Sequence, residues 1–123
     1  MNLEILEESF SICKIKNLKD IDVRDPFFFL AKTDEELSLV CTTTCVPEYT
    51  VERKDNYKGI RIQGTLDFSL VGILAHITGI LATEEISVFA VSTYNTDYLF
   101  IEEKQFYAAL KALGNEGYDI LVF

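Results

Sequence analysis

The hydrophobic and polar positions of this sequence form two kinds of pattern. Short runs rich in β-branched and aromatic residues, several of them alternating apolar with polar positions, are typical of half-buried β-strands. They cover residues 10–15, 27–32, 37–43, 58–63, 86–94, 98–101 and 118–123. Two longer segments, residues 69–85 and 103–114, repeat apolar residues at the spacing of an α-helix. The second half of the chain therefore predicts the order strand, helix, strand, strand, helix, strand.

That order predicts an α+β fold. It is the order of a ferredoxin-like βαββαβ unit, in which two helices cover one face of a four-stranded antiparallel sheet. The first half offers three strands, polar connections at residues 17–26 and 47–56, and no long helix. We therefore expect a β-rich first half that is poor in helix and a complete βαββαβ second half.

The first of the two predicted helices is the most apolar segment of the chain. Asp67 and Ser69 can each offer a side-chain oxygen to the free N–H groups at a helix start, so we expect the helix to open there. Its apolar residues cover well over half of the helix circumference, which is typical of a helix that packs on more than one side. They are Leu70, Val71, Ile73, Leu74, Ile77, Ile80 and Leu81. We expect a sheet on one side of it and a second helix or subunit on the other.

Composition and charge limit the classes of function. The chain has 123 residues, of which 49% are hydrophobic, enough for the core of one domain or of two very small ones. Its net charge of −9 argues against sequence-independent binding to nucleic acid or to anionic membranes, since both need clustered Lys and Arg. No apolar run approaches the roughly 20 residues that cross a bilayer, and the first residues carry glutamates where a secretory signal would be basic. A cytoplasmic location is expected.

The residue types that commonly carry chemistry form no catalytic or metal-binding pattern in this sequence. Cys13, Cys41 and Cys45 are expected to be reduced, buried and inert, with the last two on one face of a strand. The single histidine, His76, lies far from them in sequence. The aspartates at residues 20–25 lack the glycine and the glutamate that a calcium-binding loop needs at its sixth and twelfth positions. We expect no metal, no cofactor and no catalytic residue.

At residues 57–123 the sequence resembles the ACT domain. The segments that carry the resemblance are GTLDFSLVGIL, ISVFAVSTYNTDYLFI and the helix start at Glu102 and Glu103. They are similar to a subfamily of small tandem-ACT proteins, which is related to the ACT repeats of the eukaryotic cytosolic arginine sensor and more distantly to those of aspartate kinases. The resemblance implies an ACT domain at residues 57–123. It also implies an abbreviated ACT-like unit at residues 1–56, in which the strands are preserved and the helices are reduced.

The resemblance further implies a binding site. ACT domains commonly bind an amino acid at an interface between two ACT units, through the turn after the first strand and through the end of the second strand. The position that Asp97 resembles contacts the positively charged part of the ligand in the arginine sensor. In this chain the turn carries Asp67, Phe68, Ser69, Leu70, Val71 and Gly72, and the strand end carries Thr93, Tyr94, Asn95 and Asp97.

The chemistry of these residues suits an amino acid. The N–H groups at a helix start carry partial positive charge and favour a carboxylate. Asp97 can pair with an ammonium group or a cationic side chain, and Tyr94 can form a wall of the pocket or stack on a cation. Each feature also has a simpler interpretation, as a helix cap, a glycine that lets helices pack closely, or the chemistry of a hairpin turn.

We expect a non-enzymatic regulatory or sensory module that binds a small ligand, with an amino acid as the leading candidate, and that forms a homodimer. The alternative is a structural module for dimerisation or protein–protein interaction that binds no ligand. An enzyme is the least favoured class, because the sequence shows no nucleophile with a paired base, no metal cluster and no phosphate-binding glycine loop. The sequence does not identify the protein that would receive the signal.

Overall fold

Two long strands, β1 (Asn2–Ile15) and β4 (Glu52–Ile62), organise the computed structural model of this chain, which describes residues 1–62 and 72–122. The chain divides into two compact units, and each of these strands contributes to both. Unit 1 consists of Met1–Glu7 and Lys58–Phe123, and unit 2 consists of Glu8–Tyr57. The division of the sequence into ACT-like repeats between residues 56 and 57 stays a prediction.

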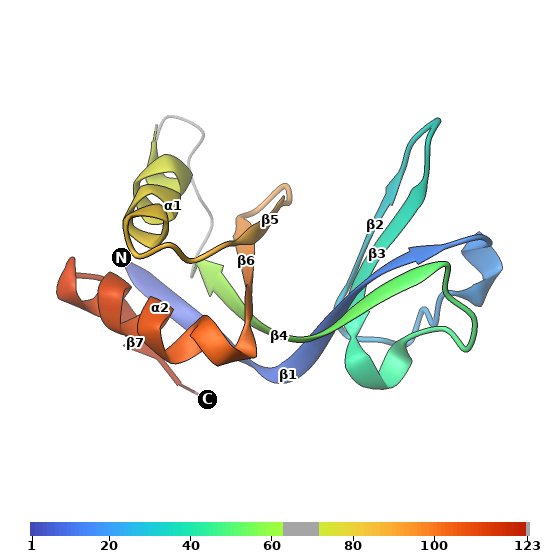
Figure 1. Cartoon of the computed structure of the whole chain (residues 1–123), viewed down its shortest axis with the longest axis horizontal. Coiled ribbons are helices and arrows are strands. Elements are labelled where there is room, and N and C mark those ends of the chain that lie inside the picture. Colours follow the sequence, from blue (N-terminus) through green and yellow to red (C-terminus); the bar gives the residue numbers. More distant parts are fainter. Residues whose placement is uncertain (63–71, 123) are drawn as a thin grey trace. The chain divides into compact units, whose positions relative to one another are not determined.

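Unit 1 has the predicted βαββαβ order of elements (Figure 1). After β4 come the helix α1 (Ile73–Thr83), the antiparallel strands β5 (Phe89–Ser92) and β6 (Asp97–Glu102), the helix α2 (Glu103–Asn115) and the strand β7 (Asp119–Leu121). The α+β, ferredoxin-like fold predicted for the second half of the chain is confirmed.

The sheet of unit 1 contains one strand that the sequence pattern does not predict. The first residues of β1 lie between β4 and β7, and β7 runs parallel to them with Leu3 opposite Ile120. The sheet is therefore larger than the four-stranded antiparallel sheet expected. Acidic residues obscure the strand pattern here, but Glu4 forms a 2.6 Å ion pair with Arg61, while Leu3 is fully buried.

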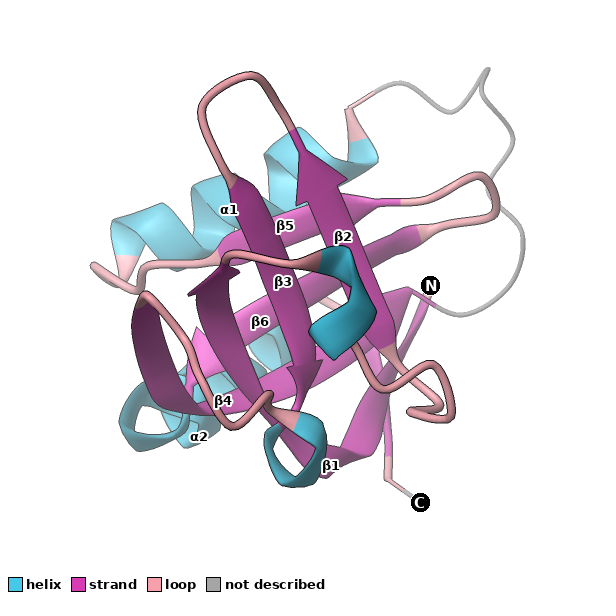
Figure 2. Ribbon diagram, turned by 90° about the vertical axis from the view of Figure 1, so that its right-hand side faces the viewer, coloured by secondary structure: helices cyan, strands magenta, loops and turns pink. Residues whose placement is uncertain are grey.

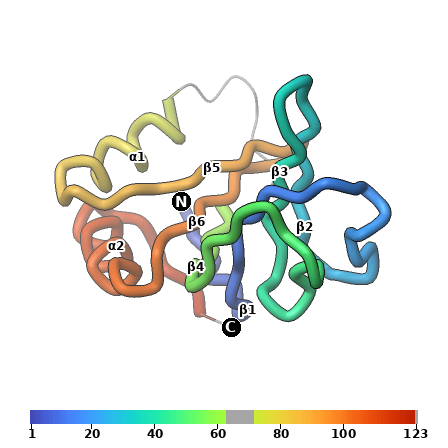
Figure 3. The backbone as a smooth tube through the Cα atoms, turned by 45° about the vertical axis from the view of Figure 1, so that its right-hand side comes forward, coloured from blue at the N-terminus to red at the C-terminus, as the bar shows by residue number. Residues whose placement is uncertain are grey.

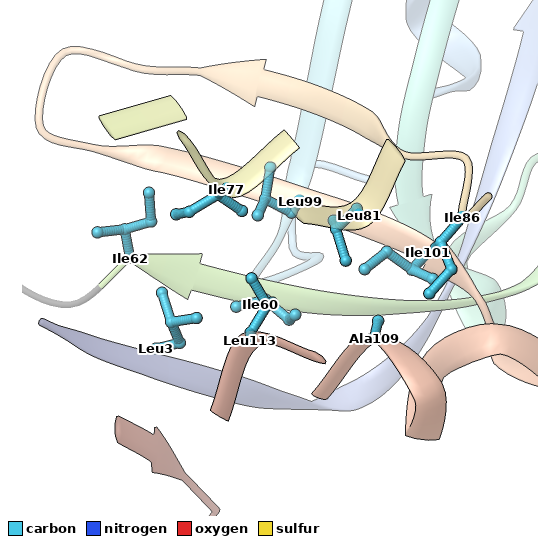
Figure 4. Packing of buried hydrophobic residues seen from close by; sticks show 10 residues of the cluster. All are labelled: Leu3, Ile60, Ile62, Ile77, Leu81, Ile86, Leu99, Ile101, Ala109 and Leu113. Carbon is cyan, nitrogen blue, oxygen red and sulfur yellow. The ribbon is translucent and has the colours of Figure 1, made fainter. Parts of the chain in front are cut away.

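The core of unit 1 lies between its two helices and one face of this sheet (Figure 4). Leu99 and Ile101 lie two residues apart on β6, so their side chains point to the same face of the sheet. Both belong to one core cluster with residues of α1 and α2, so the two helices cover that face. Helix α1 also packs beside α2 (Figure 3), as its apolar circumference predicts. The buried residues of this core are Leu3, Ile60, Ile62, Ile77, Leu81, Ile86, Leu99, Ile101, Ala109 and Leu113.

The two helices begin and end for local reasons. Helix α1 begins at Ile73, and Gly72 before it has a left-handed φ of +85°, so the helix does not run through Gly72 from the predicted start at Asp67 and Ser69. Helix α2 has an acidic residue in its first turn, as predicted from the helix dipole. It ends before Gly117, whose φ is +95°. Neither described helix has the length and apolar character needed to cross a lipid bilayer.

Unit 2 has the same order of strands, with short 3₁₀ turns in place of helices. From β1 the chain passes through η1 (Leu18–Asp20), β2 (Phe28–Lys32), β3 (Leu37–Thr42) and η2 (Thr43–Cys45) to β4. Strand β3 lies between β2 and β1 and is antiparallel to both (Figure 2). The predicted abbreviated unit, with preserved strands and reduced helices, is confirmed.

Two local predictions in unit 2 are wrong. The charged residues at the start of β4 form part of a strand and not an irregular connection, and two of them, Arg53 and Asp55, pair along the same strand face at 2.8 Å. Strand β3 ends at Thr42, so Cys41 and Cys45 do not share a strand face. All the cysteines are free thiols, and Cys45 is the least buried of them.

Candidate functional site

Apart from Gly72, the described part of the predicted site is the turn that joins β5 to β6. Ser92 and Asp97 face each other as the last pair of the two strands. Between them, the N–H of Thr93 donates to the carbonyl oxygen of Thr96 at 2.9 Å, and the Thr93 hydroxyl donates to the same oxygen at 2.9 Å. Short polar side chains favour such turns because they hydrogen-bond the nearby backbone. This turn is therefore well fixed by its own residues.

A buried hydroxyl joins this turn to the end of β4. Thr96 is 6% exposed, and its Oγ1 donates to the carbonyl oxygen of Ile62 at 2.8 Å. Ile62 is the last residue of β4, so the ends of the first and second strands of the βαββαβ unit are neighbours. The sequence does not reveal this contact, because it depends on how the strands align.

Asp97 is the acidic residue of this site. It is only 9% exposed, and its Oδ1 accepts a hydrogen bond from the Ser92 hydroxyl. Within residues 1–62 and 72–122, no other hydrogen-bond donor to this carboxylate is present. An ionised carboxylate can accept about four hydrogen bonds, so Asp97 has capacity left for a cationic partner.

The remaining predicted residues of the strand end lie on the surface of the turn. Thr93, Tyr94 and Asn95 are exposed, and Tyr94 is 86% exposed. This exposure fits a surface turn. It also fits one wall of a pocket, provided that a second surface covers the Tyr94 ring, because stacking on a ligand requires the ring to leave water.

Gly72 is the one residue of the predicted helix-side turn that the structure describes. Its carbonyl oxygen accepts the N–H of His76 at 2.8 Å. No described atom lies within 4 Å of the position that a Cβ would occupy, so the positive φ explains this glycine better than close helix packing does. The other predicted residues, Asp67, Phe68, Ser69, Leu70 and Val71, lie outside the described residues, and their role stays a prediction.

A groove of about 450 Å³ runs along α1 and the end of α2. At its edge, His76 Nδ1 lies 2.6 Å from the hydroxyl oxygen of Tyr118. Burial raises the pKa of Tyr118, and the nearby Glu116 carboxylate adds to this effect. His76 thus has a structural partner. In the part of the chain that is described, no group of His, Cys, Asp and Glu side chains is arranged to hold a metal ion.

Comparison with protein families identifies residues 52–115 as matching a family model described as the ACT domain. The matched segment runs from the start of β4 to the end of α2 and covers just over half of the chain. It therefore includes the β5–β6 turn with Asp97. No curated protein matches the chain at a significant level.

Several solved structures share the fold. Protein Atu0741 from Agrobacterium tumefaciens is 26% identical, with a TM-score of 0.87 over 99% of this chain and 92% of that one. A Vibrio cholerae protein of unknown function, VC0802, described as a possible transport protein, is 21% identical, with a TM-score of 0.72 over 93% and 88%. The regulatory subunit of aspartate kinase from Thermus thermophilus, in its ligand-free form, is 9% identical, with a TM-score of 0.63 over 94% and 96%.

Proposed function

This chain belongs to the ACT domain family, and we propose that it is a non-enzymatic regulatory module that binds an amino acid. The ligand lies where the β5–β6 turn and the start of α1 meet a second ACT unit. The module acts in the cytoplasm, as a homodimer, and passes its signal to another protein. Its likeness in fold to an aspartate kinase regulatory subunit supports this role.

Asp97 is the observation that carries the proposal. A carboxylate that is 9% exposed loses much of its hydration, so it needs hydrogen-bonding or cationic partners. The Ser92 hydroxyl meets only part of that need. In the proposed complex, the ammonium group or cationic side chain of the ligand supplies the rest. The N–H groups of the segment before α1 receive the ligand carboxylate.

A thermal-shift screen of the full chain against the common amino acids tests the proposal. A ligand that binds only the folded state stabilises it by about 2.7 kcal/mol at a hundredfold excess over Kd. This should raise the melting temperature by on the order of 10 °C, and the response should saturate with ligand concentration. If every amino acid leaves the melting temperature unchanged, the ligand proposal fails.

Substitution of Asp97 then tests the site. Asp97→Asn should weaken a cationic ligand by about 1.5–3 kcal/mol, because a charge-assisted hydrogen bond is lost, and calorimetry would show this as roughly a ten- to hundredfold rise in Kd. Asp34→Asn is the matched control, since Asp34 is exposed in the turn between β2 and β3 and has the same charge. If the two folded variants bound the ligand with equal affinity, Asp97 would not be part of the binding site.

The second candidate function is a dimerisation or docking module without a ligand. Strand β5 supports it, because β5 ends the described sheet order and exposes 38% of Phe89. An edge strand of this kind is available to pair with another chain. Sedimentation of the protein with and without amino acids tests this candidate: a stable dimer that no amino acid affects favours it, and a monomer excludes its dimerisation form.

A further inference from the structure

The groove of about 450 Å³ along α1 and the end of α2 has no part in the proposed function. We propose that it binds a linear aliphatic polyamine, a narrow apolar chain with an ammonium group at each end. The groove belongs to unit 1 alone, and Asp97 does not line it. Three of its lining residues, Gly79, Glu84 and Glu116, are unfavourable for the helices that carry them. Such conflicts with local preference are expected at functional sites.

Gly79 lies in the middle of α1, where a glycine is destabilising relative to alanine. Its φ is not in the left-handed region, and no described atom lies within 4 Å of the position that a Cβ would occupy. Neither a turn nor close packing in the described chain therefore requires a glycine here. Ala75 and Thr83, one turn away on either side, line the same groove. Small side chains thus keep the floor of the groove low along α1.

Both helices end with negative charge at this groove. Glu84 is the C-cap of α1 and Glu116 is the C-cap of α2, and neither helix has a basic residue in its last turn. A helix C-terminus carries partial negative charge and favours a cation, so a carboxylate there is unfavourable. Neither carboxylate has an ion pair within residues 1–62 and 72–122, and residues 63–71 contain no lysine or arginine. Cations from outside the chain would therefore stabilise both helix ends.

The two helix ends lie at opposite ends of the groove. The start of α2 lies beside the end of α1, where Gln105 Nε2 donates to the carbonyl oxygen of Glu85 at 3.4 Å. The end of α2 lies beside the first half of α1, where His76 contacts Tyr118. The helices are therefore antiparallel. Along α1, the rise from His76 to Glu84 is about 12 Å, which is comparable to the length of extended spermidine.

The part of the groove between these ends suits an aliphatic chain. Ala75, Gly79, Ile80 and Ala112 line it, and a narrow polymethylene chain would cover the half-buried Ile80 side chain. The glutamates at the ends are exposed, and a single exposed ion pair contributes little in water. Two ammonium groups on one chain bind together, because the first contact raises the effective concentration of the second. The groove therefore favours a polyamine over a monoamine.

Calorimetric titration of the full chain with spermidine tests the proposal. The wild-type chain should bind one spermidine with a Kd in the millimolar range or below, and butylamine, with one ammonium group, should bind about tenfold more weakly. Glu84→Gln combined with Glu116→Gln should raise the Kd for spermidine about tenfold. Glu35→Gln combined with Glu48→Gln is the matched control, because these exposed residues of unit 2 remove the same net charge. It should change the Kd by less than about twofold.

Gly79→Leu tests the floor of the groove. No described atom crowds a Cβ at this position and leucine favours helix, so the variant should remain folded. Its side chain would occupy the groove, and spermidine binding should be lost. Circular dichroism checks the fold. Asp97→Asn should leave spermidine binding unchanged, so this proposal and the amino-acid site can fail separately.

Other results would overturn the proposal. These are the absence of saturable binding at millimolar spermidine, an equal Kd for butylamine, or full spermidine affinity in folded Gly79→Leu. An equal effect of the two double glutamate variants would also overturn it, because the binding would then depend on net charge alone. If Gly79→Leu fails to fold, the comparison of these double variants still decides the matter.

Discussion

Units 1 and 2 have the same order of strands but are held together differently. In unit 1 two full helices, α1 and α2, cover an aliphatic core. In unit 2 the corresponding connections contain only the three-residue turns η1 and η2, and the buried cluster consists of a few apolar residues and two thiols. The comparison shows that the same strand order can be stabilised with or without helices.

Polar contacts replace the helices in unit 2. Asp25 is 7% exposed, and its two carboxylate oxygens accept the N–H groups of Phe27 and Thr42, each at 3.0 Å. One carboxylate thus joins the connection after β1 to the end of β3. Ser11 donates to Asp55, so the Thr43 hydroxyl, at 2.9 Å, is the donor to Ser11. Buried polar groups that are fully hydrogen-bonded can fix a structure in this way.

The largest expected effect tests the aliphatic core. Leu81→Ala, at a fully buried position of α1, should lower the free energy of unfolding by about 3 kcal/mol, because it leaves a cavity between helix and sheet. Leu39→Ala in unit 2 removes the same atoms from a smaller cluster and should cost less, about 2 kcal/mol. Urea unfolding followed by circular dichroism measures both. A larger loss for Leu39→Ala would contradict the comparison.

The next effect tests the polar support of unit 2. Asp25→Ala should lower the free energy of unfolding by about 2 kcal/mol, because two backbone N–H groups lose their acceptor. Asp25→Asn keeps one acceptor oxygen and should lose less. Asp34→Ala, at an exposed position of the same charge, should change the stability by no more than about 0.5 kcal/mol. If Asp25→Ala and Asp34→Ala changed the free energy of unfolding equally, the Asp25 carboxylate would not be a support of unit 2.

A smaller effect concerns the start of α1. Gly72→Ala should destabilise the protein by about 1 kcal/mol, because its φ of +85° is unfavourable for a residue with a Cβ, and Gly72→Val should cost more. Gly79→Ala is the matched control within α1, where no described atom crowds the new methyl group. It should stabilise the helix by about 0.5–1 kcal/mol. Thermal unfolding of the variants should therefore show shifts of opposite sign.

The smallest effect is a change in titration. The Ser11 hydroxyl, followed by Arg53, lowers the pKa of Asp55 below its ordinary value of 3.8. The associated stability is present above pH 3.8 and is lost as the pH falls through the lowered pKa of the folded state. Ser11→Ala should move the pKa of Asp55 back toward 3.8 in an NMR titration of the carboxyl carbons. Asp22, whose pKa is lowered by Arg24, is the internal control and should not change.

Elements governed by neighbours in sequence are predictable here. The β5–β6 turn follows from its polar residues, and α2 follows from its apolar spacing, its acidic first turn and Gly117. The first residues of β1 are not predictable in this way, because their partners in β7 lie at the other end of the sequence. The start of β4 escapes prediction because it is a strand with exposed, charged side chains.

The candidate site shows the same limit. The resemblance identifies the residues of the strand end, including Asp97. It does not reveal that the Asp97 carboxylate is nearly buried beside the Ser92 hydroxyl, or that Thr96 contacts Ile62, because both facts depend on strand register. The placement of Cys13 and Cys41 on one face of the paired strands β1 and β3 depends on register as well, whereas sequence spacing alone draws attention to Cys41 and Cys45.

Unit 1 consists of two separate segments of the chain, and this has a consequence for synthesis on the ribosome. Residues 1–7 are made more than a hundred residues before β7, their partner in the sheet. All of unit 2 is present once Tyr57 has emerged, so it can fold while unit 1 is still incomplete. A nascent chain that stalls before Asp119 therefore carries a whole unit 2 and a first strand whose outer edge is still open to other chains.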